Sequence, residues 1–89
     1  MEINAPRIAD EELVKLIRLK KREGAEALYD TYAKALFLAI IRIVPEKEIA
    51  ENVLEQTFIT AWHSFDLYSA EKEKVLAWMM SIARKLAWG

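Results

Sequence analysis

The chain has few of the residues on which many small functional sites depend. Its 89 residues include no cysteine, two glycines, two prolines and one histidine. The lack of cysteine excludes disulfides and thiolate metal sites. The single histidine, His63, cannot supply a di-iron bundle, which needs a Glu-x-x-His motif on two helices. Two widely separated glycines exclude a glycine-rich phosphate loop. We therefore expect no metal, no cofactor and no catalytic residue, and a protein that is not an enzyme.

Long apolar runs and an excess of charge of one sign are lacking too. The longest nearly apolar stretch, residues 35–44, contains Arg42 and is far shorter than the roughly 20 residues of a membrane span. The first ten residues have no apolar run like that of a signal peptide. We therefore expect a cytoplasmic protein without membrane insertion. The formal net charge of -1 argues against simple binding to duplex phosphates, which usually requires a basic face.

The charges are nevertheless segregated along the chain. A basic cluster over residues 15–22 precedes an acidic cluster over residues 46–55, and Arg84 and Lys85 lie near the end. Each cluster is consistent with a solvated helix face and with a binding surface. The charge pattern therefore leaves a nucleic-acid partner open.

Apolar residues at helical spacing are abundant. Hydrophobic residues make up 54% of the chain, and their recurrence at intervals of three and four predicts amphipathic helices. We expect an all-α fold, a compact bundle of about four helices over residues 10–89, behind a tail over residues 1–9. Asp10 is the expected N-cap of the first helix, Gly24 its break, and Pro45 the end of the second. The helices are expected over residues 11–23, 25–44, 46–65 and 75–88, with a loop over residues 66–74.

The second and third helices are expected to form the centre of the bundle. Because a bundle this small cannot bury all its apolar residues, part of them should meet a partner. The outer face of the third helix is acidic and amide-rich around Ile59, a composition found on docking surfaces and on helices that bind nothing. Trp78 is open to two interpretations, an edge of the core or a stacking plane for a nucleobase. The expected core comprises Leu28, Tyr32, Leu36, Ile40, Val53, Leu54, Phe58 and Trp62.

Three stretches in the same order resemble a known family. Residues 27–33 (ALYDTYA), 50–62 (AENVLEQTFITAW) and 76–87 (LAWMMSIARKLA) are similar to successive parts of region 2 of extracytoplasmic-function sigma factors, in the sigma-70 family. The resemblance covers the chain from about Asp10 to its end. It implies the compact helical fold of sigma region 2.

The resemblance also implies partners. The acidic face of the third helix would dock on the clamp helices of the RNA polymerase β′ subunit, and an anti-sigma factor is a further partner that the family allows. The residues expected to bind polymerase are Glu48, Glu51, Asn52, Glu55, Gln56 and Ile59. The loop and the fourth helix would capture the single-stranded non-template −10 element of promoter DNA, with one base flipped into a pocket. The residues expected to bind this strand are Leu67, Tyr68, Ser69, Ala70, Glu71, Lys72, Lys74, Trp78, Ser81, Arg84 and Lys85.

Two segments depart from the family pattern. Residues 69–74 read SAEKEK where the family loop often has Asp-Pro-Glu-Arg-Gly-Ser, and residues 51–56 read ENVLEQ where acidic-Asp-x-x-Gln-acidic is typical. They support an alternative function, a helical protein-interaction domain of the same fold that has lost promoter binding. An independent helix-turn-helix DNA binder is disfavoured, because no short helix pair carries a basic recognition helix. Region 4, the second helical domain of the family, has no counterpart before Gly89, so we expect an excised domain or a natural fragment.

Overall fold

The fold is built from helices alone over the part of the chain that the structure, a computed structural model, describes. This part is residues 10–89, so the expected tail over residues 1–9 lies outside it. The elements are α1 (Asp10–Arg18), α2 (Arg22–Ile43), α3 (Lys47–His63), the short 3-10 helix η1 (Phe65–Leu67) and α4 (Val75–Trp88). No strand occurs over residues 10–89, and the predicted all-α bundle is confirmed. In the same residues, no helix has the length and apolar character needed to cross a membrane.

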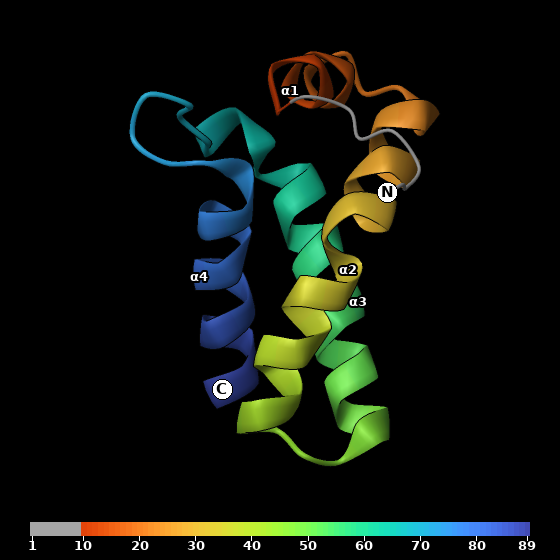
Figure 1. Cartoon of the computed structure of the whole chain (residues 1–89), viewed down its shortest axis with the longest axis vertical. Helices are drawn as coiled ribbons and strands as arrows, with labels where there is room; N and C mark the ends of the chain where they lie inside the picture. The colour runs from red at the N-terminus through yellow and green to blue at the C-terminus, as the bar shows by residue number, and fades with distance from the viewer. Residues whose placement is uncertain (1–9) are drawn as a thin grey trace, which may run out of the picture.

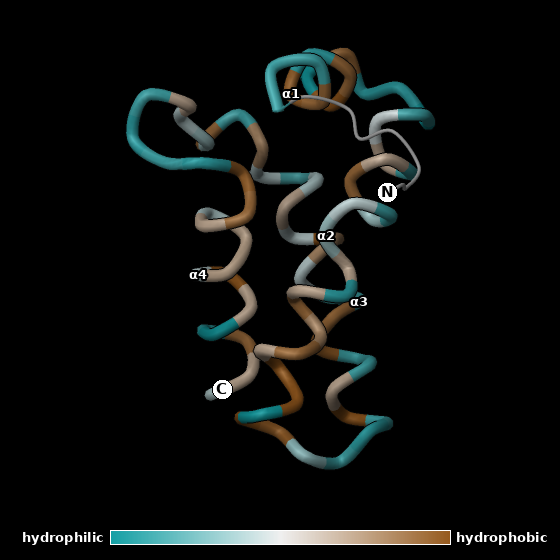
Figure 2. Tube along the Cα trace, in the orientation of Figure 1, coloured by the Kyte–Doolittle hydropathy of each residue, from teal (hydrophilic) through white to brown (hydrophobic). Residues whose placement is uncertain are grey.

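The three longer helices form a bundle that α1 closes at one end. α2, α3 and α4 run up and down in turn, and each packs against the other two (Figure 1). α1 lies across the end of the bundle where α3 leads into α4, and it contacts both α2 and η1. The loop between η1 and α4 lies at this same end and is largely hydrophilic (Figure 2). The arrangement therefore places α1 and the loop side by side.

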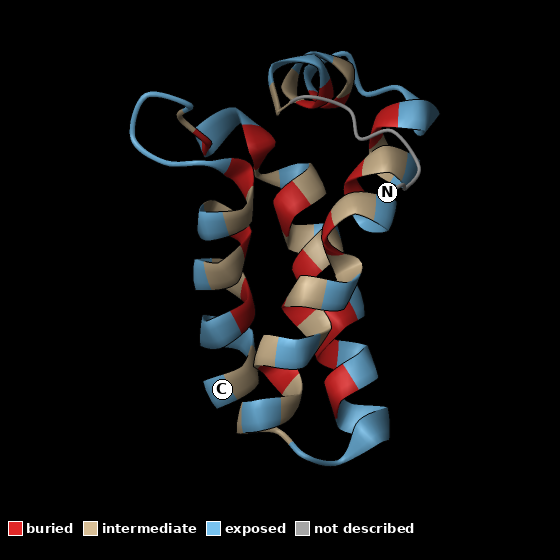
Figure 3. Ribbon diagram, in the orientation of Figure 1, coloured by how far each residue is buried: buried red, intermediate tan, exposed pale blue. Residues whose placement is uncertain are grey.

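The core lies where α2, α3 and α4 face one another, and α1 adds the fully buried Leu13 and Ile17 to it. Buried positions line the inner sides of these helices (Figure 3). Six of the eight residues predicted for the core are buried, whereas Phe58 and Trp62 are only half-buried. The centre of α3 is instead occupied by the small residues Ala50, Thr57 and Ala61, which allow close helix packing. The Thr57 hydroxyl donates a hydrogen bond of 2.8 Å to the Val53 carbonyl, so this buried polar group is satisfied.

The helix end predicted at a proline agrees with the structure. The helix ends that depend on tertiary contacts differ from the prediction. α2 ends at Ile43, before Pro45, as predicted. α3 ends at His63, so Phe65 belongs to η1 and is buried under the loop. The predicted N-cap at Asp10 is wrong. Asp10 is the first residue of α1, and its carboxylate accepts a hydrogen bond of 2.6 Å from the Tyr32 hydroxyl of α2.

The predicted break at Gly24 is also wrong. Gly24 lies inside the first turn of α2 and is buried. The Leu16 backbone lies so close that a Cβ at Gly24 would be 2.8 Å from its carbonyl carbon, which leaves no room for a side chain. The chain turns earlier, at Lys20, whose φ of 57° is left-handed. The Lys20 amide donates to the Ile17 carbonyl at 2.9 Å and the Lys21 amide to the Leu16 carbonyl at 3.4 Å. These two bonds form the Schellman arrangement that ends many helices, with lysine in the position usually held by glycine.

Candidate protein-docking and nucleic-acid surfaces

The outer side of α3 presents the residues predicted to bind a protein. All six of them are exposed, and their spacing of three and four places them on one side of the helix. Three are carboxylates and two are amides, and Ile59 is 44% exposed among them. The Glu51 carboxylate lies 4.0 Å from the Lys47 ammonium in an exposed i,i+4 pair, which contributes only about 0.3–0.5 kcal/mol. Glu51 therefore remains available to a cation on a partner.

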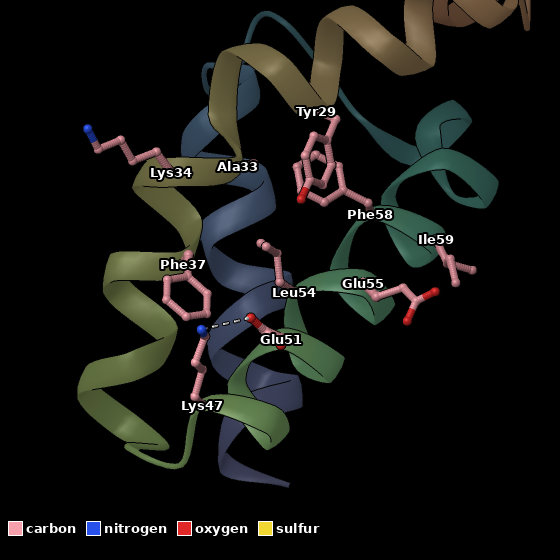
Figure 4. A pocket seen from close by; sticks show the side chains of 10 residues that line it. All are labelled: Tyr29, Ala33, Lys34, Phe37, Lys47, Glu51, Leu54, Glu55, Phe58 and Ile59. Atoms are coloured by element: carbon pink, nitrogen blue, oxygen red, sulfur yellow. Dashed lines mark ion pairs between the residues drawn. The ribbon is translucent and has the colours of Figure 1, made fainter.

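A groove runs between α2 and α3 beside this face, and we call it the α2–α3 groove (Figure 4). The rings of Tyr29 and Phe58 lie against one another in it, with centroids 4.9 Å apart and planes at 43°. Both rings keep part of their surface in solvent. The groove is lined by Tyr29, Ala33, Lys34, Phe37, Lys47, Glu51, Leu54, Glu55, Phe58 and Ile59. An apolar floor with charged edges is typical of a surface that receives an amphipathic helix.

The groove continues along the two helices toward the end of α3. Tyr29, Phe58 and Ile59 also line a second hollow, which extends to Trp62 and His63. The apolar strip is thus longer than one pocket and follows the helix pair.

Tyr29 and Phe37 belong to the apolar periodicity of α2, so the sequence alone does not distinguish them from the core residues of this helix. Helical periodicity shows that these residues share a side of α2, but not which of them a neighbouring helix covers. The available signal was the excess of large apolar residues over what so small a bundle can bury. That excess had predicted a partner without locating its site.

The second candidate surface is the loop before α4. Leu67 is 76% exposed, residues 70–74 are exposed and Ser69 is intermediate. Tyr68 differs, because its side chain is 5% exposed and its ring stacks on Phe65 at a centroid distance of 5.1 Å. The Tyr68 ring therefore belongs to the packing that supports the loop, and it is not accessible to a nucleic-acid strand. This corrects its predicted role as a direct contact.

Trp78 joins the same aromatic cluster from α4. Its ring meets Phe65 edge-on and Tyr68 at a tilt, each at 5.5 Å between centroids. The side chain is half-buried, so the position at the edge of the core is confirmed. Lys74, Trp78, Ser81 and Lys85 follow one another at steps of four, three and four, which places them along one side of α4. Arg84 lies beside them, and it is exposed like Ser81 and Lys85.

The opposite side of the loop faces α1 across an acidic hollow. Three acidic residues (Asp10, Glu11 and Glu73) and one basic residue (Lys74) line it, together with Tyr32 and Tyr68. Burial raises the pKa of the Tyr68 phenol above its ordinary 10.0; the carboxylates of Asp10 and Glu73 raise it further, while Arg18 opposes them. Over residues 10–89, acidic and histidine side chains form no cluster suited to a metal ion.

Comparison with known proteins identifies the family. Residues 28–88 match the family model described as Sigma-70 region 2, which is more than half of the chain. The chain belongs to this family. The matched segment includes most of α2, all of α3, the loop and α4, and thus both candidate surfaces of the region 2 domain. α1 and the turn at Lys20 precede the match.

Curated relatives of the region 2 domain are extracytoplasmic-function (ECF) sigma factors. It is 34% identical over 68 residues to ECF RNA polymerase sigma factor SigX of Bacillus subtilis, a match that covers 73% of this chain and 33% of SigX. It is 28% identical over 60 residues to ECF RNA polymerase sigma factor SigL of Mycobacterium tuberculosis, covering 67% of this chain and 34% of SigL. The chain thus spans about a third of the length of these relatives. No solved structure matches it significantly.

Proposed function

We propose that this domain recognises and melts the promoter −10 element as part of an RNA polymerase sigma factor. In this function the outer face of α3 and the α2–α3 groove dock on the clamp helices of the β′ subunit. The loop before α4 and the exposed side of α4 hold the non-template strand. The observation that carries the proposal is the aromatic groove beside the acidic face of α3, within the segment that matches the family.

The groove supports docking because its apolar and charged parts are arranged for a helix. Tyr29, Phe37 and Phe58 supply the large side chains that dominate protein interfaces. Glu51 and Glu55 lie on the α3 edge together with Lys47, which pairs with Glu51, whereas Lys34 lies on the α2 edge. A partner helix with a basic flank toward α3 and an apolar stripe toward the groove would complement both the carboxylates of the α3 edge and the apolar side chains of the groove.

The loop and α4 support strand capture in a different way. Arg84 and Lys85 can neutralise phosphates, which gives affinity without sequence preference. The exposed loop offers backbone and side-chain groups to the edges of unpaired bases, and such contacts carry sequence preference. Extruding a base costs a few kcal/mol, which stacking and edge hydrogen bonds in a pocket can offset.

The test of docking is capture of the RNA polymerase β′ subunit by the immobilised domain at physiological salt. Glu55→Lys should weaken capture by at least about tenfold, because a like charge then faces the basic flank of the partner. Glu12→Lys, the same change at an exposed position on α1, is the matched control and should bind like the wild type. Equal capture of all three proteins would exclude this face as the docking site.

A second candidate function is a protein-interaction domain that has kept the groove and lost promoter binding. It is favoured by the acidic hollow on one side of the loop and by the small number of exposed cations on α4. Capture of β′ together with no binding to single-stranded −10-like DNA at low salt would select this function over the first.

A further inference from the structure

The loop that the proposed function assigns to base recognition is fastened across its width by one side chain. The Tyr68 hydroxyl donates a hydrogen bond of 2.8 Å to the carbonyl of Glu73, at the far end of the loop. Within the span, the amides of Lys72 and Glu73 donate to the Ser69 carbonyl at 3.1 and 3.3 Å. The Tyr68 ring is itself fixed between Phe65 and Trp78. The loop therefore has a defined shape although most of its residues are exposed.

A second fastening comes from α1. The Arg18 guanidinium donates to the Tyr68 carbonyl at 3.3 Å, across 50 residues of sequence. Its central carbon also lies 5.4 Å from the centroid of the Phe65 ring, a cation–π distance. α1 is in turn tied to α2 by the bond from Tyr32 to Asp10. The first residue of the loop is thus held by a helix that precedes the segment matched to the family.

We propose that Tyr68 and Arg18 are positioning residues for base recognition, which hold residues 69–73 in the conformation that reads the strand. This inference rests on the proposed function. Neither residue needs to touch DNA, because each acts through the loop backbone. A loop that is ordered before binding loses less conformational entropy when a base docks, and it presents one set of donors and acceptors rather than several. Loss of this order in the loop should therefore reduce discrimination between bases more than it reduces the overall affinity for the strand.

The decisive variant is Tyr68→Phe, which keeps the ring in its aromatic cluster and removes only the hydroxyl. Amide hydrogen exchange of residues 69–73 should become roughly 3- to 10-fold faster, the size expected for one net hydrogen bond. Fluorescence anisotropy with oligothymidine strands that differ at two central bases should show a similar loss in the ratio of best to worst affinity. The salt dependence should stay unchanged, because Arg84 and Lys85 remain in place.

Matched controls separate this role from general destabilisation. The controls are read by the same loop exchange and base preference. Arg18→Ala should reproduce the effects of Tyr68→Phe, whereas Lys15→Ala, which removes an exposed cation from the same helix, should not.

A Tyr68→Phe protein with unchanged loop exchange would overturn the inference. Faster exchange with an unchanged base preference would overturn it as well, and leave the proposed function standing. A wild type that binds none of the strands, while it still captures β′, would overturn strand capture and with it this inference.

Discussion

The ammonium group of Lys20 lies 4.6 Å from the centroid of the Trp62 indole ring and donates to the carbonyl oxygen of the same residue. Trp62 belongs to the last turn of α3, where carbonyl groups lack partners within the helix. A cation is favoured there by the helix dipole and by the indole face. The contact joins the turn after α1 to the end of α3, a contact that a glycine in this left-handed position could not make.

Two substitutions at Lys20 separate the backbone from the side chain. Lys20→Ala keeps the left-handed strain and loses the contact with Trp62, so it should destabilise the domain by roughly 0.5–1 kcal/mol. Lys20→Gly loses the contact but relieves the strain, and should be about 1 kcal/mol more stable than the alanine variant. Urea denaturation followed by circular dichroism measures both. An alanine variant as stable as the glycine variant would show that φ at Lys20 is not strained.

Gly24 should not tolerate a side chain. The atoms that an alanine Cβ would meet belong to the backbone of Leu16 and Ile17, which cannot rotate away. Overpacking of this kind costs about 1–3 kcal/mol, which should exceed the roughly 1 kcal/mol that alanine gains over glycine in a helix. Gly24→Ala should therefore lower the melting temperature. A higher melting temperature would mean that α1 does not lie against Gly24.

Phe58 should matter more for docking than for folding. Its ring is half-buried in the groove, so Phe58→Ala should cost roughly 1–3 kcal/mol, less than the 3–5 kcal/mol of a fully buried phenylalanine. The variant should remain helical by circular dichroism and lose most of its β′ capture. Ile82→Ala, a truncation of a half-buried residue on α4, serves as the control for stability. Undiminished capture by the Phe58 variant would remove the groove from the interface.

Stability at alkaline pH should depend on Tyr68. Its phenol has a raised pKa in the folded domain, since burial and the carboxylates of Asp10 and Glu73 disfavour the phenolate. The folded state therefore holds this proton more tightly than the unfolded state. The corresponding stability is complete below pH 10 and is lost as the pH rises through and above that value. In urea denaturation from pH 8 to 11, Tyr68→Phe should lose less stability than wild type and Tyr29→Phe. Identical profiles for all three would contradict the prediction.

Arg84 and Lys85 should contribute affinity without base preference. Each phosphate contact on a single strand contributes about 0.7 to the slope of log affinity against log salt. The double variant Arg84→Ala, Lys85→Ala should therefore flatten this slope by up to about 1.4 and weaken all strands similarly. Anisotropy titrations at several salt concentrations provide the measurement. Equal binding by the double variant and the wild type would show that the strand does not run along α4.

Much of the fold could be predicted from local sequence, and the exceptions share a physical cause. The spacing of Leu28, Leu36 and Ile40 is enough to define α2 and its buried side, and Pro45 is enough to end it. The predictions for Asp10 and Gly24 were wrong because they considered only neighbours in the sequence. Asp10 resembles a helix cap and Gly24 a helix break, but in each case a contact with a residue distant in the sequence decides the structure. For Asp10 this contact is the Tyr32 hydroxyl, and for Gly24 it is the Leu16 backbone.

The candidate surfaces likewise divide into features that helical periodicity predicts and features that depend on tertiary contacts. The exposed face of α3 follows from helical periodicity, and its six residues were all foreseen. The groove required knowledge of which α2 side chains α3 leaves uncovered, and Tyr29 and Phe37 carry no local mark of this. The support of the loop by Arg18 was equally invisible, because its partner Tyr68 lies 50 residues away and the bond is to a backbone carbonyl.

The attachment of α1 has a consequence for how the domain opens. α2, α3 and α4 each pack on both of the others, whereas α1 packs mainly on α2 and η1. Leu13 and Ile17 of α1 are fully buried, so release of α1 would uncover part of the core. It would also withdraw Arg18 from the Tyr68 carbonyl. The conformation of the loop therefore depends on the docking of α1, a helix outside the segment matched to the family.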